Sequence, residues 1–161
     1  MGSPVSVHRH ERRHQLGHLV TTLHLGVIDV PYLDAEGKTT GDVAEILEKK
    51  YHVMEIFAET HGQQIADHLA EGMGGALESL MMGGPTDLTK AVGGATSKIA
   101  DDMKQFIASG EMETLGYPGV PTKAALTGVN HRLKKKRGPR RVSFVDTGQY
   151  QASMTDWVEF D

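Results

Sequence analysis

Apolar positions at helical spacing dominate the middle of the chain. From residue 40 they repeat every three or four positions, which predicts an amphipathic helix over about 40–58. Thr39 or Thr40 supplies the N-terminal cap, and Asp42 and Glu45 suit the positive end of the helix dipole. The predicted buried face consists of Val43, Ile46, Leu47, Tyr51, Met54, Phe57 and Ala58.

The same spacing predicts further helices, separated by glycine and proline. We expect Gly62 to break or kink the first helix, and a second helix to run on to Gly83-Gly84-Pro85. A third helical stretch follows a Thr86-Asp87 cap and is expected to be interrupted at Gly93-Gly94, because glycine is unfavourable inside helices. A short helix capped by Thr122 is expected within 122–133.

Both ends of the chain have a different pattern. Residues 16–30 fit a helix by one set of leucines and a strand by another, so both alternatives stay open. Residues 150–160 alternate as a strand would. We therefore predict an α+β fold: a mainly helical body with a short sheet that includes the C-terminal strand. A single domain over 1–161 is expected, with a polar N-terminal arm at 1–15 and a basic loop plus C-terminal strand at 131–161.

Charge is strongly segregated along the chain. The net charge of −4 combines +2 over residues 1–25, −9 over 26–131, +7 over 132–141 and −4 over 142–161. A cationic segment on an acidic body indicates an anionic partner, either a nucleic acid or the acidic body of another copy. The candidate DNA or intersubunit contacts are Arg132, Lys134, Lys135, Lys136, Arg137, Arg140 and Arg141.

The basic segment leads into Phe144-Val-Asp-Thr-Gly148, which matches the signature of aspartic proteases. Such a fold needs a long β-rich segment after the turn, and only thirteen residues follow Gly148. We favour a turn in which Asp146 accepts backbone N–H bonds and Gly148 supplies a positive φ. The turn and strand residues predicted to act in assembly are Phe144, Asp146, Thr147, Gly148, Tyr150, Trp157 and Phe160.

Few other residues of the sequence suggest a catalytic or metal-binding site. His10, His14 and His18 have the i, i+4, i+8 spacing of a metal-binding helix face, but a polar arm is the preferred interpretation. His61 and His68 are interpreted as structural. The chain has no cysteine and no apolar run of the roughly 20 residues that a membrane-spanning helix needs. We expect no catalytic residue, no metal and no cofactor.

Several segments resemble tailed-bacteriophage virion proteins. They begin with Asp42-Val-Ala-Glu-Ile-Leu-Glu48 and Tyr51-His-Val-Met-Glu55, and continue with Gly119-Val-Pro-Thr-Lys-Ala-Ala-Leu126 and His131-Arg-Leu-Lys134. They end with Ser143-Phe-Val-Asp-Thr-Gly-Gln-Tyr-Gln-Ala-Ser153 and Trp157-Val158. The Asp-Thr-Gly pattern is also similar, more loosely, to head–tail connector and tail-completion proteins that form rings at the neck.

The resemblance implies a non-enzymatic structural subunit of the particle, at the head–tail connector or upper tail. Its expected partners are further copies of itself, other virion proteins and, without sequence specificity, packaged DNA, with no membrane. It would be made in the host cytoplasm and located in the virion. The alternative is a nucleic-acid-binding module that acts through residues 132–141.

Overall fold

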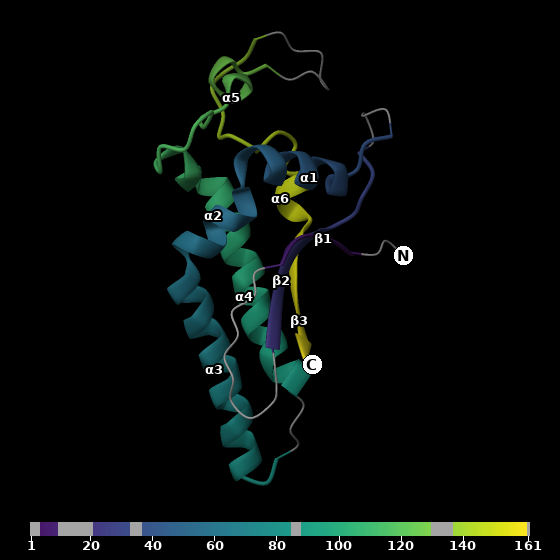
Figure 1. Ribbon diagram of the computed structural model, residues 1–161, viewed down its shortest axis with the longest axis vertical. Helices are drawn as coiled ribbons and strands as arrows, with labels where there is room; N and C mark the ends of the chain where they lie inside the picture. Colours follow the sequence, from purple (N-terminus) through teal and green to yellow (C-terminus); the bar gives the residue numbers. More distant parts are fainter. Residues whose placement is uncertain (1–3, 10–20, 33–36, 85–87, 130–136, 161) are drawn as a thin grey trace.

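The computed structural model describes residues 4–9, 21–32, 37–84, 88–129 and 137–160 of the 161-residue chain. The molecule is elongated, with a pair of long helices at one end and a short helix with loops at the other (Figure 1). Helices make up most of the body and the sheet is small, so the predicted α+β class is confirmed.

The sheet has three antiparallel strands in the order β1-β2-β3. Strand β1 spans Pro4–Arg9, β2 spans Thr21–Ile28 and β3 spans Met154–Phe160. The strand alternative for residues 16–30 is therefore correct from Thr21 onward, and β3 completes the protein's own sheet. Residues 4–9, expected in a polar arm, pair with β2 instead, because Pro4-Val-Ser-Val alternates as strands do.

Helix α1 spans Thr40–Tyr51 and begins as predicted. Thr39 and Asp42 form a reciprocal capping box at its N-terminus. The single helix predicted over 40–58 is wrong, because His52 adopts a left-handed conformation at φ 53° and ends α1. Helix α2, Val53–Thr60, follows directly, and the buried carboxylate of Glu48 accepts hydrogen bonds from the first N–H groups of α2, those of Met54 at 2.8 Å and Glu55 at 3.1 Å.

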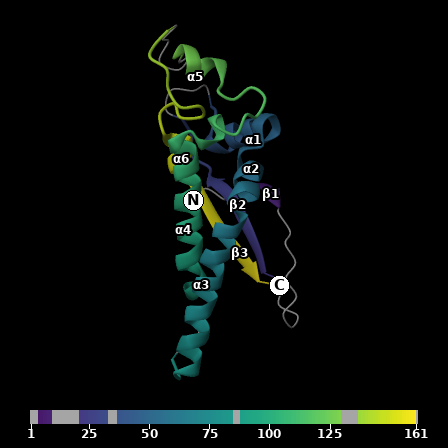
Figure 2. The ribbon, with the colours of Figure 1, turned by 90° about the vertical axis from the view of Figure 1, so that its left-hand side faces the viewer.

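Helices α3, Gly62–Met81, and α4, Leu88–Ser109, form the long antiparallel pair. The break at Gly62 is confirmed, while the Thr86-Asp87 cap lies outside the described residues. The interruption expected at Gly93-Gly94 is wrong: α4 runs through both glycines. Their cost of about 1 kcal/mol each is offset by the buried side chains on either side, those of Val92, Ala95 and Ile99. Figure 2 shows the sheet beside this helix pair.

Short elements connect α4 to the last strand. A 3-10 helix, η1, spans Glu111–Glu113, α5 spans Lys123–Thr127 and α6 spans Gln149–Ala152. Thr122 caps α5 as predicted, but Gly128 ends that helix well before residue 133. Tyr150, expected in the terminal strand, lies on α6 and is buried, because Gly148 at φ 78° starts a helical turn there.

The core lies where α1, α2, α4 and α6 meet the inner face of the sheet. Phe57, Ile99, Met103 and Phe106 are at most 2% exposed. Val27 of β2 and Met154 of β3 join them, so the last strand is fastened to the centre of the molecule.

Candidate functional site

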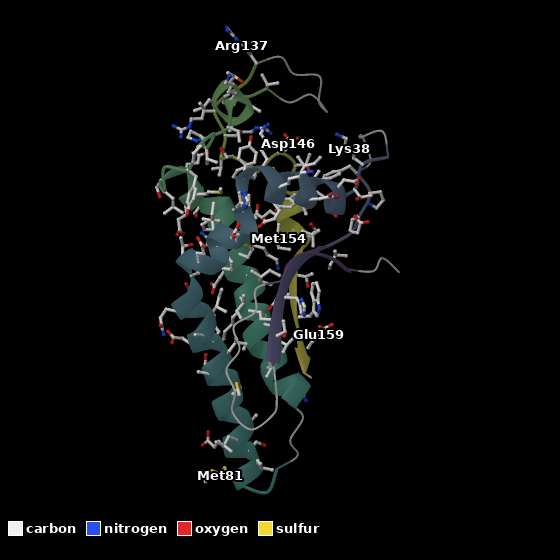
Figure 3. The ribbon with its side chains drawn as sticks, viewed as in Figure 1. Lys38, Met81, Arg137, Asp146, Met154 and Glu159 are labelled. Atoms are coloured by element: carbon white, nitrogen blue, oxygen red, sulfur yellow. The ribbon has the colours of Figure 1, made fainter. Side chains whose placement is uncertain are left out.

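The basic segment is partly folded onto the body. Residues 130–136, with Arg132, Lys134, Lys135 and Lys136, lie outside the described residues. Arg140 forms an ion pair with Glu113 at 2.9 Å, and Arg141 pairs with Asp146 and donates to the carbonyl of Val129 at 2.9 Å. Arg137 is exposed at the far end of the molecule from Met81 (Figure 3). The last two cations therefore anchor the segment within the chain, while Arg137 faces solvent.

Glycine is essential where the basic segment meets α5. Gly128 has φ 64°, and a Cβ atom there would lie 2.4 Å from the carbonyl carbon of Gly138. The N–H of Gly138 donates to the Thr127 carbonyl at 3.2 Å, and the N–H of Arg141 donates to that of Ala125 at 3.1 Å. The C-terminal part of the basic segment is thus held to α5 by its backbone.

Glu113 is the acceptor that fastens the basic segment to the body. Its Oε1 accepts from the N–H of Ser143 at 2.8 Å and the hydroxyl of Ser143 at 2.7 Å, while its Oε2 accepts from Arg140. Burial raises the pKa of Glu113, but the bonds from Ser143 and Arg140 outweigh it and lower that pKa overall. Sequence reasoning missed Glu113, because one acid among the sixteen of the body carries no local signal.

The Asp-Thr-Gly sequence forms a turn that leads into α6. Gly148 has the positive φ that was predicted, and the hydroxyl of Thr147 accepts the N–H of Gln149 at 3.4 Å. Asp146 pairs with a guanidinium, whereas an aspartic-protease site needs a second carboxylate that shares a proton. Phe144, at φ 67°, packs its ring against Tyr51 with 5.2 Å between centroids.

A small cavity of about 130 Å³ lies beside this turn. Its walls come from α1, α5, α6 and the turn, and include Tyr32, Leu47, Arg141, Asp146 and Tyr150. The hydroxyl of Tyr150 has no hydrogen-bond partner among the described residues, and burial raises its pKa, with Glu48 and Tyr32 adding to the effect. The cavity is smaller than the roughly 300–1,000 Å³ of ordinary ligand pockets.

Several of the described histidines and carboxylates contact one another or core side chains. His10, His14 and His18 lie outside the described residues. His61 packs between Phe57 and Phe106, and His68 pairs with Asp102 at 2.8 Å, as a structural role predicts. Ligand atoms of Glu48, His52 and Glu55 lie within 4.8 Å of one another. However, the Glu48 oxygens already accept backbone N–H bonds and His52 pairs with Glu55 at 2.7 Å, so the cluster serves the helix junction.

The C-terminal strand β3 occupies one edge of the sheet. Trp157 is half-buried and stacks on His24 of β2, with ring centroids 5.1 Å apart, and His24 also contacts Glu159 at 3.0 Å. The backbone of Phe160 pairs with Thr21. On the opposite face of β3, burial raises the pKa of Asp156 to about 7, with Lys104 opposing the rise and Asp101 adding to it.

Asp156→Asn is expected to stabilise the protein at pH 8 by about 1–2 kcal/mol and to change little at pH 4. The raised folded-state pKa means that the unfolded chain ionises first as the pH rises. The stabilisation that the folded state gains because Asp156 keeps its proton is therefore complete below about pH 4. It is lost as the pH rises through 7. Urea unfolding of both proteins at the two pH values measures the difference. Asp67→Asn, at an exposed position on α3, is the control, and equal effects of Asp156→Asn at both pH values would contradict the expectation.

No family model, curated protein or solved structure matches this chain. Among the described residues no helix is long and apolar enough to cross a membrane.

Proposed function

We propose that this chain is a non-enzymatic structural subunit of a tailed-phage particle, at the head–tail connector or upper tail, where copies of it form a ring. The resemblance of six segments to virion proteins supports this function; they are residues 42–48, 51–55, 119–126, 131–134, 143–153 and 157–158. So does the Asp-Thr-Gly sequence, which makes a turn held by an ion pair.

An exposed apolar face on the far half of α3 carries the proposal. Of the residues of α3, Ala76 is buried, whereas large side chains farther round the helix remain open to solvent. The exposed fractions are 53% for Met73, 57% for Leu77, 53% for Leu80, 81% for Met81 and 82% for Met82. The first four repeat at i, i+4, i+7 and i+8, so they share one face of the helix. Monomeric proteins rarely expose large contiguous apolar patches, so this face supports the proposal of an assembly surface.

Gly74 lies at the flank of this face, where an added Cβ would meet nothing within 4 Å. Another copy or another virion protein can therefore approach the α3 backbone closely at that position. The exposed Arg137, at the other end of the molecule, is available to packaged DNA or to an acidic neighbour. The protein would be made in the host cytoplasm and function in the virion.

Leu77→Gln combined with Met81→Gln is expected to raise the protein concentration for half-assembly by about tenfold, because polar side chains replace the centre of the apolar face. Light scattering of the purified protein, with negative-stain imaging of the particles, measures this. Glu78 lies on the same helix outside the apolar face, so Glu78→Gln is the control. A wild-type protein that stays monomeric and is absent from particles would refute the proposed function.

A nucleic-acid-binding module remains the second candidate, because Arg137 is exposed while Arg140 and Arg141 are held in ion pairs. Neutralising Lys134, Lys135, Lys136 and Arg137 together should weaken duplex binding and flatten its salt dependence, since fewer counterions are released. Lys49→Gln, an exposed position on α1 outside the basic segment, is the control. Equal binding by wild type and the fourfold variant would eliminate this candidate.

A further inference from the structure

The sheet has two outer edges that no other described strand covers. Its order is β1-β2-β3, so β1 and β3 each pair with β2 on one side alone. An unpaired strand edge presents a row of N–H and C=O groups that readily accept another strand. Among the described strands, these two edges are the ones that a strand of another copy could extend.

The strand directions determine what kind of contact those edges can make. Both β1 and β3 are antiparallel to β2, so they run in the same direction. A copy related by rotation about an axis along the strands would place its β1 beside β3 in parallel. A two-fold axis would instead pair β3 with a second β3 in antiparallel orientation. The first contact joins unlike surfaces, which generates rings when the rotation closes.

The register places complementary residues at the same height on the two edges. Ser6, Gly26 and Thr155 lie opposite one another across the three strands, and Arg9, His24 and Trp157 do the same. If neighbouring copies are not shifted along the ring axis, the backbone of Arg9 in one copy therefore lies at the level of Trp157 in the next. Glu159 is two residues farther along the same face of β3, within the diagonal reach of an arginine.

Charge and exposure favour this partner. Strand β1 ends at Arg9, while β3 carries Glu159 on the same face as Trp157. The Glu159 side chain is 60% exposed, and Trp157 is half-buried. Arg9 and Glu159 carry opposite charges, and opposite charges on neighbouring strands attract each other.

We propose that strand β1 of one copy pairs in parallel with strand β3 of the next, so that the three-stranded sheets join into one continuous sheet around the ring. The proposal rests on the ring assembly put forward above. Strands β2 and β3 run along the long axis of the molecule in Figure 1, so joined copies would stand side by side. The α3–α4 ends would then form one rim and the Arg137 ends the other.

The absence of cysteine from the chain allows a direct test. The double variant Ser6→Cys with Thr155→Cys places one thiol on each edge at the same level. Parallel β1–β3 contacts predict an oxidation ladder of dimer, trimer and higher bands under denaturing conditions. Each single variant should give no ladder, because one thiol per chain allows a dimer at most. A bismaleimide linker extends the reach if neighbours are offset by a residue or two.

The outcomes separate this pairing from the ring itself. Light scattering could show a ring while neither oxidation nor the linker gives a ladder. That result would overturn the β1–β3 contact and leave the proposed function intact. Dimers from Thr155→Cys alone would show two-fold β3 pairing and would also overturn it. A double variant that is monomeric at all concentrations, like the wild-type chain, would refute the proposed function.

Charge reversal provides a second readout in the same double-cysteine protein. Glu159→Arg is expected to lower the ladder yield about fivefold, since it meets Arg9 of the neighbour. Adding Arg9→Glu to it should restore the yield. Glu159→Gln controls for loss of the contact with His24 within the chain. A yield that Glu159→Arg leaves unchanged, or that Arg9→Glu fails to restore, would contradict the proposed register.

Discussion

Replacing Phe57 with alanine is expected to lower the free energy of unfolding by about 3–5 kcal/mol. Phe57 is fully buried on α2, where its ring lies 5.6 Å from that of Phe106 on α4 and 4.8 Å from that of His61. Its removal leaves a cavity between two helices that are held in place by other buried contacts, so the surroundings can collapse only partly.

Denaturant titration followed by circular dichroism would measure the loss. Ile46→Ala is the matched control, because that side chain is 51% exposed and should cost less than about 1 kcal/mol. Comparable losses for Phe57→Ala and Ile46→Ala would show that α2 does not pack against α4 as described here.

Glu113→Ala is expected to destabilise the protein by about 2–3 kcal/mol at pH 7, because it removes a charged acceptor from Ser143 and Arg140. The pKa of Glu113 is lowered in the folded state, so its contribution is present above the ordinary value of 4.5. That contribution is lost as the pH falls through the folded-state pKa. The difference between variant and wild type should therefore shrink in acid.

Thermal unfolding at pH 7 and at about pH 3 tests both parts of this expectation. Glu111→Ala, two residues earlier on η1, is the control, since its carboxylate is 41% exposed and lies 3.5 Å from His61. Equal destabilisation by Glu113→Ala at the two pH values would mean that the ionised carboxylate is not what holds Ser143 and Arg140.

The helices of the body were the most predictable part of the fold, because their signals are local. The capping box at Thr39 and Asp42 and the cap at Thr122 are both present. The positions where one helix ends and the next begins are harder to predict from the sequence. The split at His52 depends on the Glu48 carboxylate, which caps the start of α2 from the end of α1. No propensity of His52 itself indicates such a break.

Tertiary packing overrode local preference elsewhere. The glycines at 93–94 stay helical because the apolar face of α4 is buried on both sides of them. Tyr150 alternates with its neighbours as a strand residue would, yet it is drawn into the core by the turn at Gly148. Trp157 was correctly placed on the last strand, whereas its stacking on His24 depends on a register that spacing cannot reveal.

The candidate site was predictable in its charge but not in its anchoring. The dense cations of residues 132–141 are obvious in the sequence. That Arg140 and Arg141 bond within the chain, to Glu113 and Asp146, follows from how the segment returns past η1 and α5. Contacts between positions so far apart leave no trace in local periodicity.

The close backbone contact between Gly128 and Gly138 affects which insertions and deletions the chain can accept. Because the backbone is joined just outside residues 130–136, insertions between the two glycines need not disturb α5 or the turn at Gly148. Doubling the length of a closed loop costs only about 0.6 kcal/mol in chain entropy. Related chains would then be free to lengthen, shorten or change the charge of this segment while the two glycines stay unchanged.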